Sequence, residues 1–145
     1  MTKASSVLAY LLLLVNIGMT LWGVLGFLEY LTGFALIPLQ NPNFPSGTQF
    51  MHWLTITASG LIYLLGFITR WRYTPYAMIV SYAMLGTLCT VETFDFMTAE
   101  WRYRSYINEI MLYLLLSWYF LQSGFVKRYF SGRSAGAPDP PSAAI

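Results

Sequence analysis

The sequence predicts an all-α protein, folded as an antiparallel four-helix transmembrane bundle. Four apolar stretches each have roughly the twenty residues that a helix needs to cross the hydrocarbon core of a bilayer. The stretches cover about residues 7–31, 50–69, 76–97 and 106–125. The chain is 57% hydrophobic and 10% charged, whereas soluble domains are about 25% charged. Its 145 residues leave room for one such bundle and little else.

Basic residues are distributed asymmetrically about these stretches, and their distribution predicts the orientation of the chain. In a four-pass arrangement, one side carries Lys3, Arg70, Arg72, Lys127, Arg128 and Arg133. The other side carries only Arg102 and Arg104. Cytoplasmic connections hold the excess of Lys and Arg, so we expect both termini to be cytoplasmic. The net charge of +2 is too small to suggest a nucleic-acid partner.

The first helix has features of a retained span that packs closely on a neighbour. Lys3 before an apolar run resembles a signal peptide, but the run is too long and no small-residue cleavage site closes it. Gly18, Gly23 and Gly26 would allow another helix to approach closely. Asn16 lies in the middle of the span, where we expect it to form an interhelical hydrogen bond.

The connections predict which helices are neighbours. Three prolines, Asn and Gly exclude regular structure from 38–47, and this uncharged, partly apolar loop is suited to packing on the outer mouth of the bundle. The connections at 70–74 and 98–105 are short, so the second, third and fourth helices should be successive antiparallel neighbours. The transmembrane domain should cover 1–126, followed by a basic, then Pro/Ala/Ser-rich disordered tail at 127–145.

Aromatic residues and the single cysteine are expected to be structural. Trp53, Trp71 and Trp101 lie near predicted helix ends, as residues of interfacial belts do, whereas Trp22 and Trp118 lie within spans and should pack. Cys89 has no partner for an intrachain disulfide, and inside the third helix we expect it to be a buried small residue.

Polar residues gather at the end of the helices opposite the termini. Alternate connections lie on opposite sides, so one face should hold Glu29, His52, Glu92, Asp95, Asn108 and Glu109. Ionisable groups inside a membrane are costly and are often functional. The alternative is structural, because helix ends reach the headgroup layer, where charge costs little. Glu109 in a first helical turn would also be stabilised by the helix dipole.

Glu92 and His52 are the central pair of this cluster. Glu92 lies more than one turn inside its helix, so its carboxyl group must be protonated or paired. His52 begins the helix whose outer end should lie beside it, so we predict direct or one-water hydrogen bonding between the two, with Asp95 or Glu109 nearby. Asp95 is three residues after Glu92 and would share its helix face. The candidate catalytic residues are therefore His52, Glu92, Asp95 and Glu109, as acid–base groups.

Several other chemistries lack the residues that they need. A single histidine cannot supply both axial ligands of a bis-histidine haem, and the chain has no histidine–carboxylate spacing typical of a metal site. We therefore expect no metal. There is no phosphate loop and no dinucleotide fingerprint. The residues themselves leave the cofactor unknown.

Part of the chain resembles the DoxX-like family. The resemblance rests on the sequence GLIYLLGFITRW at 60–71, on the apolar helix after it and on a final helix led by Glu109. Members of this family are small four-helix bacterial membrane proteins, and the resemblance covers about 57–124. The sequence departs from the family at Ile56, where the family tends to carry an acidic residue, and in keeping only Gly124 of a Gly-rich ending. The resemblance implies the bacterial inner (plasma) membrane, a redox-linked membrane assembly and quinone as a candidate ligand.

Three functions follow from these observations. The first is a small subunit of a redox or quinone-linked membrane complex, with the His/carboxylate cluster at its outer face and other membrane subunits as partners. The second is a non-catalytic scaffold or assembly subunit, because small-residue faces and many aromatics suit packing against other helices. The third is a stand-alone membrane enzyme or small-solute carrier, although no internal inverted repeat or broken helix is visible. Whether the chain is catalytic stays open.

Overall fold

The structure, a computed structural model, describes residues 3–131, and every regular element in this part of the chain is a helix. The elements are α1 (Lys3–Thr32), α2 (Ser46–Thr69), α3 (Thr74–Val91), the π-helical turn η1 (Glu92–Phe96), α4 (Arg102–Gln122) and α5 (Gly124–Phe130). The part of the predicted tail at 132–145 lies outside the described residues. The predicted all-α class is confirmed for the described chain.

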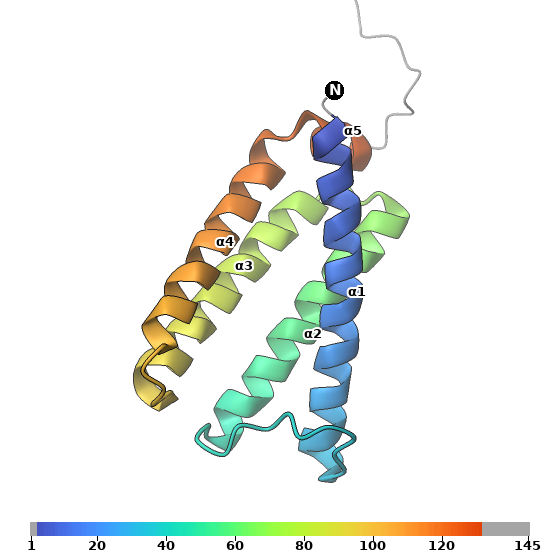
Figure 1. Ribbon diagram of the computed structural model, residues 1–145. Helices are drawn as coiled ribbons and strands as arrows, with labels where there is room; N and C mark the ends of the chain where they lie inside the picture. Colours follow the sequence, from blue (N-terminus) through green and yellow to red (C-terminus); the bar gives the residue numbers. More distant parts are fainter. Residues whose placement is uncertain (1–2, 132–145) are drawn as a thin grey trace, which may run out of the picture.

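The helices are suited to crossing a membrane. α1, α2 and the continuous α3–η1 segment are each long and apolar enough to span, and α4 with α5 would be a fourth span, bent by 66° between them. These features are those of a multi-pass integral membrane protein. The start of α1 and the end of α5 lie at the same end of the molecule (Figure 1).

The helices form two hairpins that are joined at one end. α1 packs along α2. α2 packs on α3 and α3 on α4, as the short connections between them predict. The α1–α2 and α3–α4 hairpins then diverge toward the end that carries η1 (Figure 1). Near the opposite end Ser5 Oγ and Ser123 Oγ are 2.6 Å apart, and the Tyr119 hydroxyl donates to the Ser5 carbonyl at 2.6 Å. α1 and α4 make few contacts with each other, unlike the first and last helices of a closed bundle.

Glycines allow α1 and α2 to pack closely. A Cβ on Gly23 would lie 3.0 Å from the Thr57 backbone nitrogen, and one on Gly26 would overlap the Trp53 ring. Gly18, by contrast, faces open space, so its predicted role in close packing was wrong. The buried Asn16 donates through Nδ2 to the Leu12 carbonyl, 2.8 Å away in its own helix, rather than across the interface.

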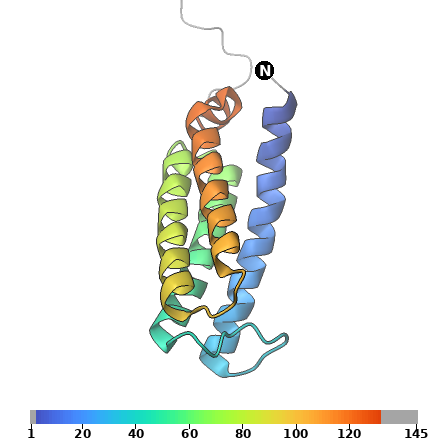
Figure 2. The ribbon, with the colours of Figure 1, turned by 60° about the vertical axis from the view of Figure 1, so that its left-hand side comes forward.

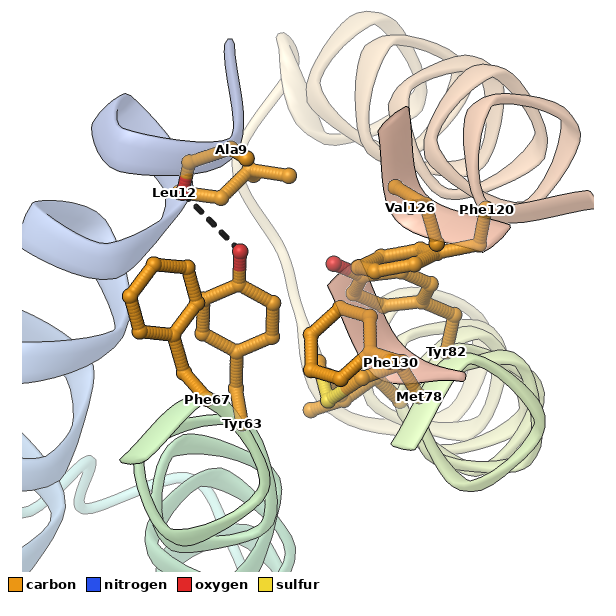
Figure 3. Packing of buried hydrophobic residues seen from close by; sticks show 10 residues of the cluster. Ala9, Leu12, Tyr63, Phe67, Met78, Tyr82, Phe120, Val126 and Phe130 are labelled. Carbon is orange, nitrogen blue, oxygen red and sulfur yellow. Dashed lines mark hydrogen bonds between the residues drawn. The ribbon is translucent and has the colours of Figure 1, made fainter. Parts of the chain in front are cut away.

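An aromatic core joins the two hairpins near α5 (Figure 3). Its buried members include Tyr63 and Phe67 of α2, Tyr82 of α3, Phe120 of α4 and Phe130 of α5. The Tyr63 hydroxyl is satisfied by the Ala9 carbonyl at 2.9 Å, which ties α2 to α1. These buried side chains hold the two hairpins together at this end.

The last predicted helix is broken. The sequence predicts one helix at 106–125, but α4 ends at Gln122 and α5 begins at Gly124. Ser123 between them has extended backbone, with φ −66° and ψ 116°, and its Oγ accepts from the Val126 backbone N–H at 3.3 Å. This N-cap starts a new helix in a new direction. Residues 127–130 thus belong to α5, and their assignment to the tail was wrong.

The third predicted helix also changes form before its end. It was predicted as one helix at 76–97, but the α-helix ends at Val91 and continues as η1. The Met97 N–H donates to the Glu92 carbonyl at 2.9 Å, five residues back, which is the hydrogen bond of a π-turn. The wider turn places residues 92–96 at different angles from those of an α-helix.

Candidate functional site

A cavity of about 300 Å³ lies between the diverging hairpins. All four long helices, η1 and the 33–45 connection contribute to its wall. The lining residues are Trp22, Leu39, Asn41, Phe44, Gln49, His52, Trp53, Cys89, Glu92, Thr93, Met97, Ser105, Tyr106 and Glu109. A volume of this order is at the lower end of the range for small-molecule sites. Four aromatic side chains lie in the wall beside seven polar ones, so the cavity combines aromatic faces with several hydrogen-bonding groups.

His52 and Glu92 form a direct pair in this wall. His52 Nδ1 lies 2.6 Å from Glu92 Oε1, and the two residues come from α2 and from the first position of η1. The Glu92 side chain is 11% exposed and that of His52 is 26% exposed. The predicted contact between these residues is confirmed. The contact is short and mostly screened from solvent.

The bond to Glu92 also fixes the role of the histidine ring. With Nδ1 directed to a carboxylate, Nε2 is the ring nitrogen that remains for a ligand. Aromatic rings hold the imidazole in place: Trp53 meets it edge-on at 4.8 Å between centroids, and Phe44 at 6.2 Å. His52 is therefore oriented by its neighbours before any ligand binds.

The 33–45 connection is fastened over this end of the molecule. Glu29 Oε2 accepts from the Leu39 N–H at 2.7 Å, and Gln40 Nε2 donates to the Gly26 carbonyl at 3.0 Å. Gln49 Nε2 donates to the Asn41 carbonyl at 2.6 Å. The prediction that this loop packs on the mouth of the helices is confirmed. Glu29 thus holds the loop in place and is not part of the cavity wall.

Of the remaining polar residues predicted at this site, the structure places some in the cavity wall and others outside it. Glu109 of α4 lines the cavity together with Glu92. Asp95 is exposed and does not line it, because the π-turn removes it from the face of Glu92. Asn108 is exposed and lies outside the wall as well. Only His52, Glu92 and Glu109 of the four candidates share the site.

Cys89 is a cavity residue that its sequence context did not reveal. It is half-buried, its Sγ is 4.0 Å from Thr93 Oγ1, and it lines the cavity together with Glu109. The expectation that it is merely a buried small residue was incomplete. Its position three residues before Glu92, on the same α-helical face, was the available signal.

Two tryptophans also have roles that the sequence did not predict. Trp53, expected in an interfacial belt, is 2% exposed and lines the cavity, with its Nε1 3.4 Å from Gln40 Oε1. Trp22, expected to pack, is half-exposed but forms part of the same wall. Trp118 is 65% exposed, so it does not pack within the chain either.

The site offers an imidazole for proton exchange with a small molecule in the cavity. The imidazole can accept a proton at Nε2, and Glu92 would stabilise the resulting cation. Glu109 is a second carboxylate in the same wall. Among residues 3–131, no group of three or more His, Cys, Asp or Glu side chains could hold a metal ion.

Comparison of the chain with protein-family models, curated proteins and solved structures finds no match.

Proposed function

We propose that this membrane protein is a small subunit of a quinone-linked redox complex, and that its cavity binds the quinone headgroup. The observation that carries the proposal is the 2.6 Å contact between His52 and Glu92 in the wall of a cavity that also contains Trp22, Trp53 and Tyr106. A DoxX-like resemblance supports it from the sequence. The ligand would be lipophilic enough to reach the cavity from the bilayer.

The residues have the properties that a quinone or quinol headgroup requires. Its ring can stack on aromatic faces such as Trp22, Trp53 and Tyr106. Its oxygen can hydrogen-bond to His52 Nε2, which accepts from a quinol hydroxyl when neutral and donates to a quinone carbonyl when protonated. Glu92 would hold the ring orientation in both states.

Quinol oxidation releases two electrons and two protons, and the two products need different acceptors. His52 would take a proton at Nε2, and Glu109 is placed in the wall to take a second one. The electrons would pass to a redox group of a partner subunit, since the proposal gives this chain binding and proton transfer only. That division is why we assign it a subunit role.

The proposal is tested by binding of a short-chain quinone to the purified protein in nanodiscs. Trp22 and Trp53 line the cavity, so bound quinone should quench tryptophan fluorescence saturably. We expect His52→Ala and Glu92→Gln each to weaken binding about tenfold, the loss of one or two good hydrogen bonds. The matched control is Glu100→Gln, which removes an exposed loop carboxylate outside the cavity and should bind as wild type.

The results distinguish a site from partitioning into lipid. Quenching that does not saturate, or that is equal in wild type, His52→Ala and Glu92→Gln, would overturn the proposal. All variants should first show wild-type circular dichroism and elution, so that loss of binding is not loss of fold.

An assembly subunit is the second candidate, because α1 and α4 lack contact along most of their length. The space between them would then accept a helix of a partner. In that case native purification in mild detergent should recover a stable partner whose amount does not depend on His52 or Glu92. A chain that purifies alone under these conditions would argue against this candidate.

A further inference from the structure

A second cavity lies at the opposite end of the helices from His52, at the elbow between α4 and α5. It has a volume of about 300 Å³. Its lining residues are Arg72, Pro75, Tyr76, Phe120, Leu121, Val126, Lys127, Phe130 and Ser131. The 66° bend turns α5 across the end of the molecule, and so encloses space between α5, the end of α4 and the start of α3.

The cavity has an apolar floor and a cationic rim. Pro75, Phe120, Val126 and Phe130 are buried beneath it. Arg72, Tyr76, Lys127 and Ser131 are exposed around it, with Leu121. Two positive charges above apolar side chains match a molecule with an anionic head and a hydrocarbon body.

No carboxylate in the described chain neutralises this rim. The acidic residues of 3–131 are Glu29, Glu92, Asp95, Glu100 and Glu109. All of them lie at the end of the helices that carries the His52 cavity, or in the connections at that end. Arg72 instead donates to the Tyr73 hydroxyl and lies over that ring at 4.5 Å. A guanidinium has five N–H donors, so this contact leaves others for a ligand.

We propose that this elbow binds an anionic phospholipid, with the phosphate between Arg72 and Lys127 and an acyl chain along Phe120 and Leu121. Basic pockets between transmembrane helices on the cytoplasmic side are suited to such headgroups. The orientation expected from the charge distribution places this end in the cytoplasmic leaflet. The site is separate from the His52 cavity and does not depend on the function proposed for it.

Native mass spectrometry of the full chain in detergent tests the site directly. Dioleoyl phosphatidylglycerol or dioleoyl phosphatidylcholine is added at matched concentrations, and retained lipid is counted. We expect wild type to retain phosphatidylglycerol at least about tenfold better, because each basic residue near an anionic lipid contributes several-fold. The double variant Arg72→Gln/Lys127→Gln should lose this preference.

The matched control removes equal charge from the same end of the molecule. Arg70 and Arg128 are exposed and do not line the cavity, so Arg70→Gln/Arg128→Gln should keep the preference. Equal loss in both double variants would show diffuse attraction and overturn the site. So would wild-type retention of phosphatidylglycerol by Arg72→Gln/Lys127→Gln.

Two further arms identify the occupant. Glycerophosphoglycerol, which has the headgroup without acyl chains, should not compete at equal concentration if the apolar floor contributes. Full competition would show an anion site rather than a phospholipid site. Asp139→Asn should leave lipid retention unchanged, and an increase would show that this acid of the chain, which lies outside the described residues, is the occupant instead.

Discussion

At the residue scale, the structure places a buried carboxylate and the only histidine in direct contact. Removing either partner should lower the stability of the fold, because a lone charge in a largely enclosed site loses its solvation. Glu92 is 9% exposed as a residue, and Trp53 and Phe44 surround the imidazole of His52. The pair therefore contributes to stability and is available for chemistry at the same atoms, so experiments must separate the two roles.

The energetic coupling of His52 and Glu92 can be measured by a double-mutant cycle. Glu92→Ala leaves the imidazole unpartnered, and His52→Ala leaves a buried acid that should protonate. We expect the double change to cost about 0.5–3 kcal/mol less than the sum of the single changes. Denaturant unfolding in detergent measures each free energy. Additive costs would show that the contact has no energetic weight.

The same cycle distinguishes a functional pair from a structural one. If the residues serve only the fold, quinone binding per folded molecule should be unchanged in all three variants. If they serve the site, binding should fall in each single variant even where folding is intact.

At the element scale, two glycines of α1 provide a comparison within one helix. Gly23→Ala should destabilise the protein by about 1–3 kcal/mol, the usual cost of overpacking, since the new Cβ would lie 3.0 Å from the Thr57 backbone nitrogen. Gly18→Ala meets open space and should be neutral or slightly stabilising. Thermal unfolding in one detergent compares the two. Equal effects would contradict the α1–α2 packing described here.

The loop over the cavity is the second element that can be tested. Glu29→Ala removes the acceptor of the Leu39 N–H, whereas Glu29→Gln keeps a carbonyl oxygen there. We expect the amide hydrogen of Leu39 to exchange at least about tenfold faster in Glu29→Ala. The reason is that this variant loses a hydrogen bond to a charged group, which is worth about 1.5–3 kcal/mol. Glu29→Gln should change it much less. Unchanged exchange in Glu29→Ala would show that other contacts hold the loop.

At the scale of the whole molecule, the protein has a basic end and an acidic end. The start of α1 and α5 lie together at the basic end (Figure 2). The loop over the cavity and the η1 turn lie together at the other end. The aromatic core closes the basic end and the hairpins diverge at the acidic one, and each end has a cavity of its own.

The orientation expected from the basic residues can be tested by labelling intact cells with an impermeant thiol reagent. In a Cys89→Ala background, Asn43→Cys and Thr98→Cys should react, because both positions are exposed at the acidic end. Tyr73→Cys, exposed at the basic end, should react only after lysis. Labelling of Tyr73→Cys in intact cells would show that the topology is the reverse of the one expected. The phospholipid site would then lie in the opposite leaflet from the one proposed.

The sequence alone was sufficient for the helical membrane architecture and for the central contact. The length of an apolar run is a local property, so the spans could be predicted. Alternating connections then placed His52 and Glu92 at one end, and the cost of an unpaired acid predicted their contact.

Only the tertiary structure decided what surrounds that contact. The divergence of the hairpins, the burial of Trp53 and the entry of Cys89 into the wall depend on packing between helices that are distant in the chain. The break at Ser123 and the π-turn that follows Glu92 could not be predicted from the sequence either, because the apolar runs that contain them indicate regular α-helix throughout.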